Sequence, residues 1–170
     1  MEQFLRNWLE WPSVTAFGST AYGWPLAEAA HFAGLILLFG GIGLFDLRML
    51  GFAKSLPVAP LRKLLPWGVF GFCLCVASGL VFVLGLQANI QRNAYDVILT
   101  DPWLQLKLIF MGIAGINLLF FYLSGMARAV DEVGANEDVP PMAKVIAGIS
   151  LFAWTGVIYW GRLIPWGLGG

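Results

Sequence analysis

The chain has 170 residues, of which 59% are hydrophobic and 12% are charged, and its mean hydropathy is +0.77. That charged fraction is about half of what a soluble domain carries, and a soluble core of this size cannot hide so much apolar surface. Ten basic and ten acidic residues cancel and no Lys/Arg tract occurs, so a nucleic-acid partner has no electrostatic basis. The composition predicts an integral membrane protein in contact with the lipid bilayer.

Residues 1–24 do not resemble a signal peptide, because tryptophans and charged residues interrupt the apolar stretches. Phe4, Trp8 and Trp11 recur at helical spacing, with charged residues on the other faces. We therefore expect an N-terminal amphipathic helix that lies in the membrane interface. Residues 13–23 are rich in small side chains and are expected to form a connector.

The first span is predicted at about 26–45, because about 20 apolar residues carry a helix across the hydrocarbon layer. Glu28 and His31, the only histidine of the chain, are its polar interruptions. Five helical turns take about 18 residues, so Glu28 and Asp46 are expected to share one side of the helix. Since a lipid-facing ionisable group is expensive, this side is expected to face protein, a cofactor or water.

Three further spans are predicted at about 65–86, 103–124 and 142–164. The second carries Gly71, Cys75 and Gly79 at steps of four, a stripe of small residues typical of a helix–helix contact. The third carries Lys107 near its start and Asn117 deeper, and Asn117 is expected to form a hydrogen bond between helices. The sequence thus predicts an all-α integral membrane four-helix bundle that forms one domain over residues 1–170.

Four spans place both termini on one side of the membrane. The connections between spans 1 and 2 and between spans 3 and 4, with their flanks, carry six of the basic residues: Arg48, Lys54, Arg62, Lys63, Arg128 and Lys144. By the positive-inside rule these two connections are cytoplasmic. We therefore expect a bacterial inner-membrane protein with both termini in the periplasm.

Four ionisable residues are predicted toward the outer leaflet: Glu28, His31, Lys107 and Arg162. Two acid–base groups and two cations at similar depth would form a polar pocket under the periplasmic surface. In the alternative interpretation, Lys107 and Arg162 extend to the lipid headgroups and Glu28 pairs with one of them.

His31 is the candidate cofactor residue, as a ligand of a haem, a bacteriochlorophyll or a metal, or as a hydrogen-bond partner of a quinone. A six-coordinate haem needs a second ligand, and Met111 is the candidate for it, against the alternative of core packing. One histidine suffices for a chlorin or a five-coordinate haem, and Ala27-x-x-x-His31 is similar to the arrangement in light-harvesting polypeptides. Glu28 and His31 are too few ligands for a closed zinc or copper site.

Asp46 and Arg48 end the first span. Two residues apart on a helix, they do not face each other, so each is expected to pair with another helix or with lipid phosphate and to fasten the interface. No nucleophile–base set, phosphate loop or carboxylate cluster occurs in the sequence, so an enzyme is not expected.

Several motifs together resemble a family pattern: Glu28-x-x-His31-x-x-Gly34-Leu35, Phe39-Gly40, Asp46-Leu47-Arg48, Leu65-Pro66-Trp67 and Gly79. The pattern is similar to that of an uncharacterised family of small four-span bacterial membrane proteins. That family in turn resembles copper-resistance D-type and cytochrome b561-type helical bundles, some of which hold haem between histidines. The family pattern often has a histidine after the Asn-x-x-x-Phe segment of the third span, where this chain has Tyr122. The resemblance therefore implies a fold and a membrane location rather than a bis-histidine haem.

The expected function is that of an accessory or anchoring subunit of a larger membrane complex, in electron transfer or photosynthesis, with other membrane subunits as partners. The first alternative is a haem-, chlorin- or quinone-binding electron-transfer protein in which Glu28 and Lys107 assist His31. The second alternative is a small transporter. It is disfavoured because spans 2 and 4 lack an ionisable residue near the middle of the membrane.

Overall fold

The computed structural model describes residues 9, 11–85 and 94–167, and all regular structure in that part of the chain is helical. Four segments are long and apolar enough to cross a membrane: Gly23–Leu50, Val58–Leu84, Pro102–Leu123 and Pro141–Ile164. The prediction of an all-α bundle with four membrane spans is therefore confirmed. The interfacial helix predicted over residues 2–11 lies almost wholly outside the described residues.

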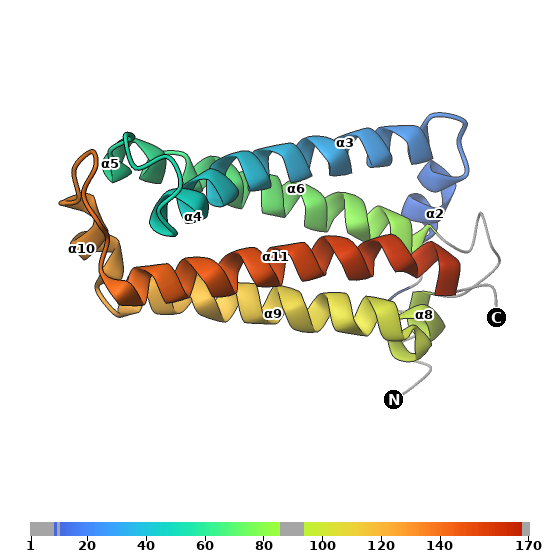
Figure 1. The fold of residues 1–170 in the computed structure, drawn as a ribbon. Helices are drawn as coiled ribbons and strands as arrows, with labels where there is room; N and C mark the ends of the chain where they lie inside the picture. Colours follow the sequence, from blue (N-terminus) through green and yellow to red (C-terminus); the bar gives the residue numbers. More distant parts are fainter. Residues whose placement is uncertain (1–8, 10, 86–93, 168–170) are drawn as a thin grey trace.

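The spans form two helical hairpins that lie side by side (Figure 1). In the first hairpin, α3 (Gly23–Leu38), the π-helical turn η1 (Phe39–Gly43) and α4 (Leu44–Met49) follow one another and pack against α6 (Leu65–Leu84). In the second hairpin, α9 (Pro102–Leu123) packs against α11 (Pro141–Gly167).

Short helices lie at the two ends of the bundle (Figure 1). The connections within the hairpins contain α5 (Val58–Arg62) and α10 (Met126–Asp131), which contact each other. We call this end, which includes residues 51–62 and 124–140, the loop end. The opposite end, with α2 (Pro12–Gly18) and α8 (Ala94–Thr100), is called the α8 end.

Prolines and a capping aspartate mark the starts of two of the long helices. Proline occupies the first turn of α6 and of α9, where its missing N–H costs no hydrogen bond. Asp101 caps α9 by accepting a hydrogen bond from the Leu104 nitrogen at 2.8 Å. Such a cap satisfies a backbone donor that the helix itself leaves unpaired.

The apolar core lies toward the loop end, where the two hairpins meet. α4 against α11 is the most extensive contact between membrane-spanning segments of different hairpins. Two edge-to-face ring contacts also link the hairpins, Phe45 with Phe121 at 5.7 Å and Phe72 with Trp154 at 5.6 Å between centroids. The buried residues are therefore concentrated around α4. Polar residues on α4 are enclosed by the two hairpins as a result.

The π-helical turn η1 changes which side of the first span faces the bundle. Before the turn Glu28 is exposed, whereas after it Asp46 is 4% exposed. The expectation that these two side chains share one side of the helix is therefore wrong. A π-turn accommodates an extra residue, and one residue corresponds to about 100° around an α-helix. Side chains after Gly43 are rotated by that amount relative to a regular helix.

Residues 12–18 form the helix α2, so the expectation of a connector over residues 13–23 is wrong for this part. α2 packs against the end of α6: the Thr15 hydroxyl is 3.4 Å from the Leu84 carbonyl oxygen, and Gly18 lies beside Gly85. Pro12 starts this helix, a role for which proline is well suited. The small residues thus serve a close contact between helices.

Candidate functional site

His31 lies on α3 with its imidazole directed at α6. Its Nδ1 atom is 2.9 Å from the Ser78 hydroxyl oxygen, and its ring packs against Phe82 with centroids 5.5 Å apart. Gly79 is adjacent, since a Cβ on it would lie 4.0 Å from His31 Cε1. α6 thus fixes the position of the ring through one polar and two apolar contacts.

Ser78 has two other possible hydrogen-bond partners besides His31. Its hydroxyl oxygen lies 2.7 Å from the Leu74 carbonyl oxygen and 3.2 Å from that of Cys75. If Ser78 donates its single proton to one of these carbonyls, its oxygen accepts from His31 Nδ1. In that tautomer of the neutral imidazole, Nε2 carries the lone pair. Within the described part of the chain Nε2 has no hydrogen-bond partner.

Lys107 approaches this histidine from the second hairpin. Its ammonium group is close enough to His31 and Cys75 to act on both electrostatically. Gly161 on α11 makes room for it, since a Cβ there would lie 3.2 Å from the Lys107 nitrogen. The Cys75 sulfur is 3.5 Å from the His31 carbonyl oxygen. The half of the bundle toward the α8 end therefore brings together a histidine, a hydroxyl, a thiol and a cation from α3, α6 and α9.

Three other residues predicted for this site are not part of it. Glu28 and Arg162 are exposed, and the ion pairs among the described residues do not include either of them. The ion pair of Glu28 in the alternative interpretation is thus absent there, because Glu28 lies on the outer side of α3. Met111 packs against the apolar core, which favours the packing interpretation over a ligand role.

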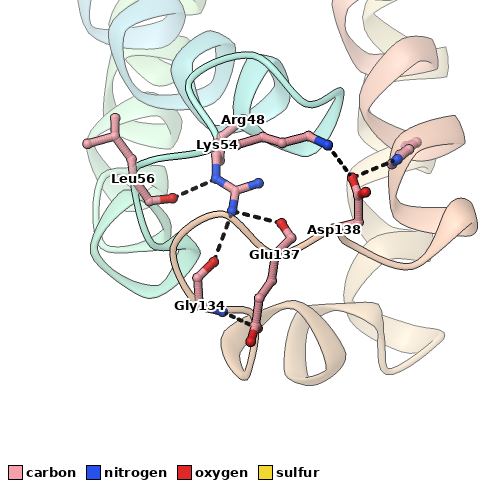
Figure 2. Close-up of polar contacts among 7 residues, drawn as sticks. Arg48, Lys54, Leu56, Gly134, Glu137 and Asp138 are labelled. Carbon is pink, nitrogen blue, oxygen red and sulfur yellow. Dashed lines mark hydrogen bonds and ion pairs between the residues drawn. The ribbon is translucent and has the colours of Figure 1, made fainter.

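At the loop end, Arg48 is 1% exposed and connects the two loops (Figure 2). Its Nε donates to the Leu56 carbonyl at 2.6 Å, and its Nη2 donates to the carbonyls of Gly134 and Glu137 at 3.1 and 3.2 Å. The expectation that Arg48 pairs with another helix or lipid phosphate is wrong, because both loops fold over the end of α4 and supply carbonyl oxygens to it. Arg48 thus fastens one hairpin to the other.

Ion pairs reinforce this junction. Asp138 Oδ1 is 2.9 Å from the Lys54 nitrogen and 3.1 Å from the Lys144 nitrogen. These hydrogen bonds, that of Lys54 first, hold the pKa of the Asp138 carboxyl below its usual value. Arg62 on α5 pairs with Asp131 on α10 at 2.7 Å. The contacts join two connections that are far apart in the sequence, so the loop end is a structural junction.

Asp46, Asn117 and Ser150 meet between the hairpins, inside the membrane-spanning part. Ser150 lies near the Asp46 carboxylate across this interface. The Asn117 amide donates to the Ile146 carbonyl at 3.0 Å, which is a hydrogen bond between α9 and α11. The three polar side chains line one cavity of about 30 Å³.

Comparison with protein-family models, with curated proteins and with solved structures found no match. The resemblance to a family of small four-span bacterial membrane proteins therefore stays a prediction.

Sequence reasoning missed both serines of these sites. Ser78 is the only hydroxyl-bearing residue between Leu65 and Leu84, and a lone hydroxyl in an apolar span must find a partner inside the bundle. That signal pointed to Ser78. Ser150 shares its span with Thr155, so the sequence did not distinguish the two.

Proposed function

We propose that the chain is an accessory membrane subunit that docks through α9 against a transmembrane helix of a larger complex. The observation that carries this proposal is an open face of small residues on α9. Gly112 and Gly115 are exposed, and nothing lies within 4 Å of a Cβ built on either of them. Exposed Leu108 and Leu119 continue the same stripe on either side.

Glycine on a lipid-facing helix is unfavourable unless it serves close packing. In a helix interior it costs about 1 kcal/mol relative to alanine. In the first hairpin glycines do serve this purpose, since a Cβ on Gly34 would lie 2.7 Å from the Gly71 carbonyl oxygen. α9 also has the smallest buried share of the four spans, 17%. A helix seated on Gly112 and Gly115 would use this open face in the manner of known small-residue contacts.

Purification of the full chain from its native membrane in mild detergent tests the proposal, with every co-eluting chain identified by mass. Gly112→Leu and Gly115→Leu are expected to lose the partner. Ala77→Leu, an equal kind of enlargement on the exposed face of α6, is expected to keep it. A chain that purifies alone, or a partner retained at the same ratio by the two glycine variants, contradicts the proposal.

We also propose that this subunit resides in a bacterial inner membrane with the loop end in the cytoplasm. The basic residues gathered at the loop end support this orientation. Labelling of Ser55→Cys, an exposed loop-end position, with a membrane-impermeant maleimide tests it. No labelling of intact spheroplasts and full labelling of inverted vesicles are expected, and the reverse pattern contradicts this orientation.

A second candidate function is binding of a tetrapyrrole at His31, with electron transfer as the role. The hydrogen bond between His31 Nδ1 and Ser78 supports it, because with Nδ1 as the donor Nε2 would carry a lone pair suited to an iron or magnesium centre. A quinone carbonyl instead needs a hydrogen-bond donor, and Lys107 is the donor near that site.

Absorption spectra of the purified chain distinguish these ligands. A tetrapyrrole gives a visible band that His31→Ala removes and that Lys107→Met leaves in place. A quinone gives no such band, is found in a solvent extract, and is lost from Lys107→Met. A colourless preparation whose extract holds no quinone contradicts the second candidate.

A further inference from the structure

The cavity beside Asp46 is lined by one polar side chain from each of three segments: Asp46 from α4, Asn117 from α9 and Ser150 from α11. Its volume of about 30 Å³ exceeds the roughly 10–15 Å³ that a cavity needs to hold one water. The rest of the lining is apolar and aromatic, including Phe45, Phe121 and Trp154. Three polar side chains therefore border a space that is large enough for one small ion or one or two waters.

Three side-chain oxygens are available there. Asp46 is 4% exposed, and its Oδ2 has no hydrogen-bond partner within the described residues. Ser150 lies near the Asp46 carboxylate. Asn117 uses its amide nitrogen for the Ile146 carbonyl, so its amide oxygen is left for another contact. Carboxylate, amide and hydroxyl oxygens are the atoms that hard cations prefer as ligands.

No basic side chain lines this cavity. Arg48, two residues further on, is directed into the loops and held by the carbonyls of Leu56, Gly134 and Glu137 (Figure 2). Lys107 lies with His31 and Cys75. A carboxylate enclosed in a membrane bundle is neutralised by a compensating charge or by a proton, and the described residues supply no such charge at Oδ2.

We propose that the cavity binds one hard monovalent cation, Na⁺, with Asp46 as the charged ligand and Asn117 and Ser150 as neutral oxygen ligands. One carboxylate balances one positive charge, so the occupied site is neutral. The π-helical turn η1 turns Asp46 toward α11 and thereby builds the site, in keeping with the frequent occurrence of such turns at functional sites. This inference is independent of the docking of α9.

The thermal unfolding of the full chain in detergent tests it, in NaCl against choline chloride at equal ionic strength. Na⁺ at about ten times its dissociation constant is expected to raise Tm by about 4 °C. Asp46→Asn is expected to abolish this difference. Asp101→Asn is the matched control and is expected to retain it, because Asp101 is also a buried aspartate with an unpartnered oxygen but does not line the cavity.

A second measurement does not depend on the folding of the Asp46→Asn variant. The native chain is expected to broaden the ²³Na NMR line, and added Li⁺ is expected to reverse the broadening. The Ser150→Ala variant is expected to need about tenfold more Na⁺ to reach half of its maximal broadening. Equal Tm in NaCl and choline chloride for the native chain overturns the proposal. So does a Tm that depends on pH and not on Na⁺, since the site then takes a proton or water only.

Discussion

The two hairpins pack their helices together in different ways. In the first hairpin glycines let two backbones touch: a Cβ on Gly71 would lie 2.5 Å from the Gly34 carbonyl oxygen and 2.7 Å from the Leu38 nitrogen. In the second hairpin rings fill the interface. Trp103 and Trp160 stack with centroids 5.5 Å apart and 8° between their planes, and Phe110 occupies the space beside Gly156.

This difference determines how much added side-chain volume each hairpin can tolerate. Backbone atoms cannot move aside without disturbing helical hydrogen bonds, whereas a ring can rotate into a new position. All four spans are strongly hydrophobic, so hydropathy does not distinguish the two solutions. The first hairpin is therefore expected to be intolerant of added volume and the second to be tolerant of it.

The largest effect is expected where the hairpins are fastened together. Arg48→Met removes the charged donor of three loop carbonyls and is expected to lower the free energy of unfolding by about 3 kcal/mol. The measurement is unfolding in mixed micelles with increasing SDS, followed by tryptophan fluorescence. Arg128→Met, an exposed side chain at the same end, is the control and is expected to change stability by less than about 0.5 kcal/mol. Equal losses in both variants would contradict the role of Arg48.

One added methyl group in each hairpin tests the comparison directly. Gly71→Ala meets backbone atoms of α3 and is expected to cost about 2 kcal/mol, whereas Gly156→Ala meets the Phe110 ring and is expected to cost about 1 kcal/mol. Both values come from the same SDS unfolding curves. The reverse order, with Gly156→Ala the more damaging variant, would show that the rings of the second hairpin are as rigid as the backbones of the first.

The polar contacts inside the two hairpins are expected to be equal in size. Ser78→Ala removes the partner of His31 in the first hairpin, and Asn117→Leu removes the donor to Ile146 in the second. With choline in place of Na⁺ as the counter-ion, so that the ligand role of Asn117 does not contribute, each is expected to cost about 0.6 kcal/mol, the typical value for hydrogen bonds between membrane helices. A loss several times larger at Ser78 alone would indicate that the first hairpin depends on the orientation of the histidine as well as on its glycines.

The smallest effect is expected from pH, at the ion pairs that join the loops. The pKa of Asp138 is held below its usual value by Lys54 and then by Lys144, so the carboxylate stabilises the junction at pH values above its usual pKa. That contribution is lost as the pH falls through the lowered pKa. Carboxyl ¹³C NMR is expected to show the pKa of Asp138 rising in Lys54→Gln. Lys63→Gln changes an exposed lysine directly after α5 and is expected to leave the titration unchanged.

The spans could be predicted because length and apolarity are properties of single segments. The predicted starts at 103 and 142 lie one residue from the observed helix starts, Pro102 and Pro141, where proline marks the first turn. The first span was predicted to end at 45 and extends to Leu50. Its last turn is stabilised by the loops that cover Arg48, and that contact cannot be read from the segment itself.

The site was harder to predict, because it depends on which side of each helix faces the interior of the bundle. The π-helical turn η1 moved Asp46 away from the side of Glu28, and the glycines at 40, 41 and 43 were the sole local hint. His31 and Lys107 were predicted at similar depth, and the structure places them near each other. The polar neighbours of His31 and Asp46 are serines on other helices, so they come together only once the helices are packed.

The cross-linked loops also bear on how the chain acquires a single orientation in the membrane. Each hairpin crosses twice, so each can enter the bilayer as a unit in either direction, and the charge bias between the two sides is modest. A second hairpin that entered upside down would place a whole membrane between Arg48 and its acceptors Gly134 and Glu137, and between Lys54 and Asp138. The loop contacts can therefore form only between halves that have entered in the same direction. An inverted half would lack them, so the contacts favour the parallel arrangement of the two hairpins.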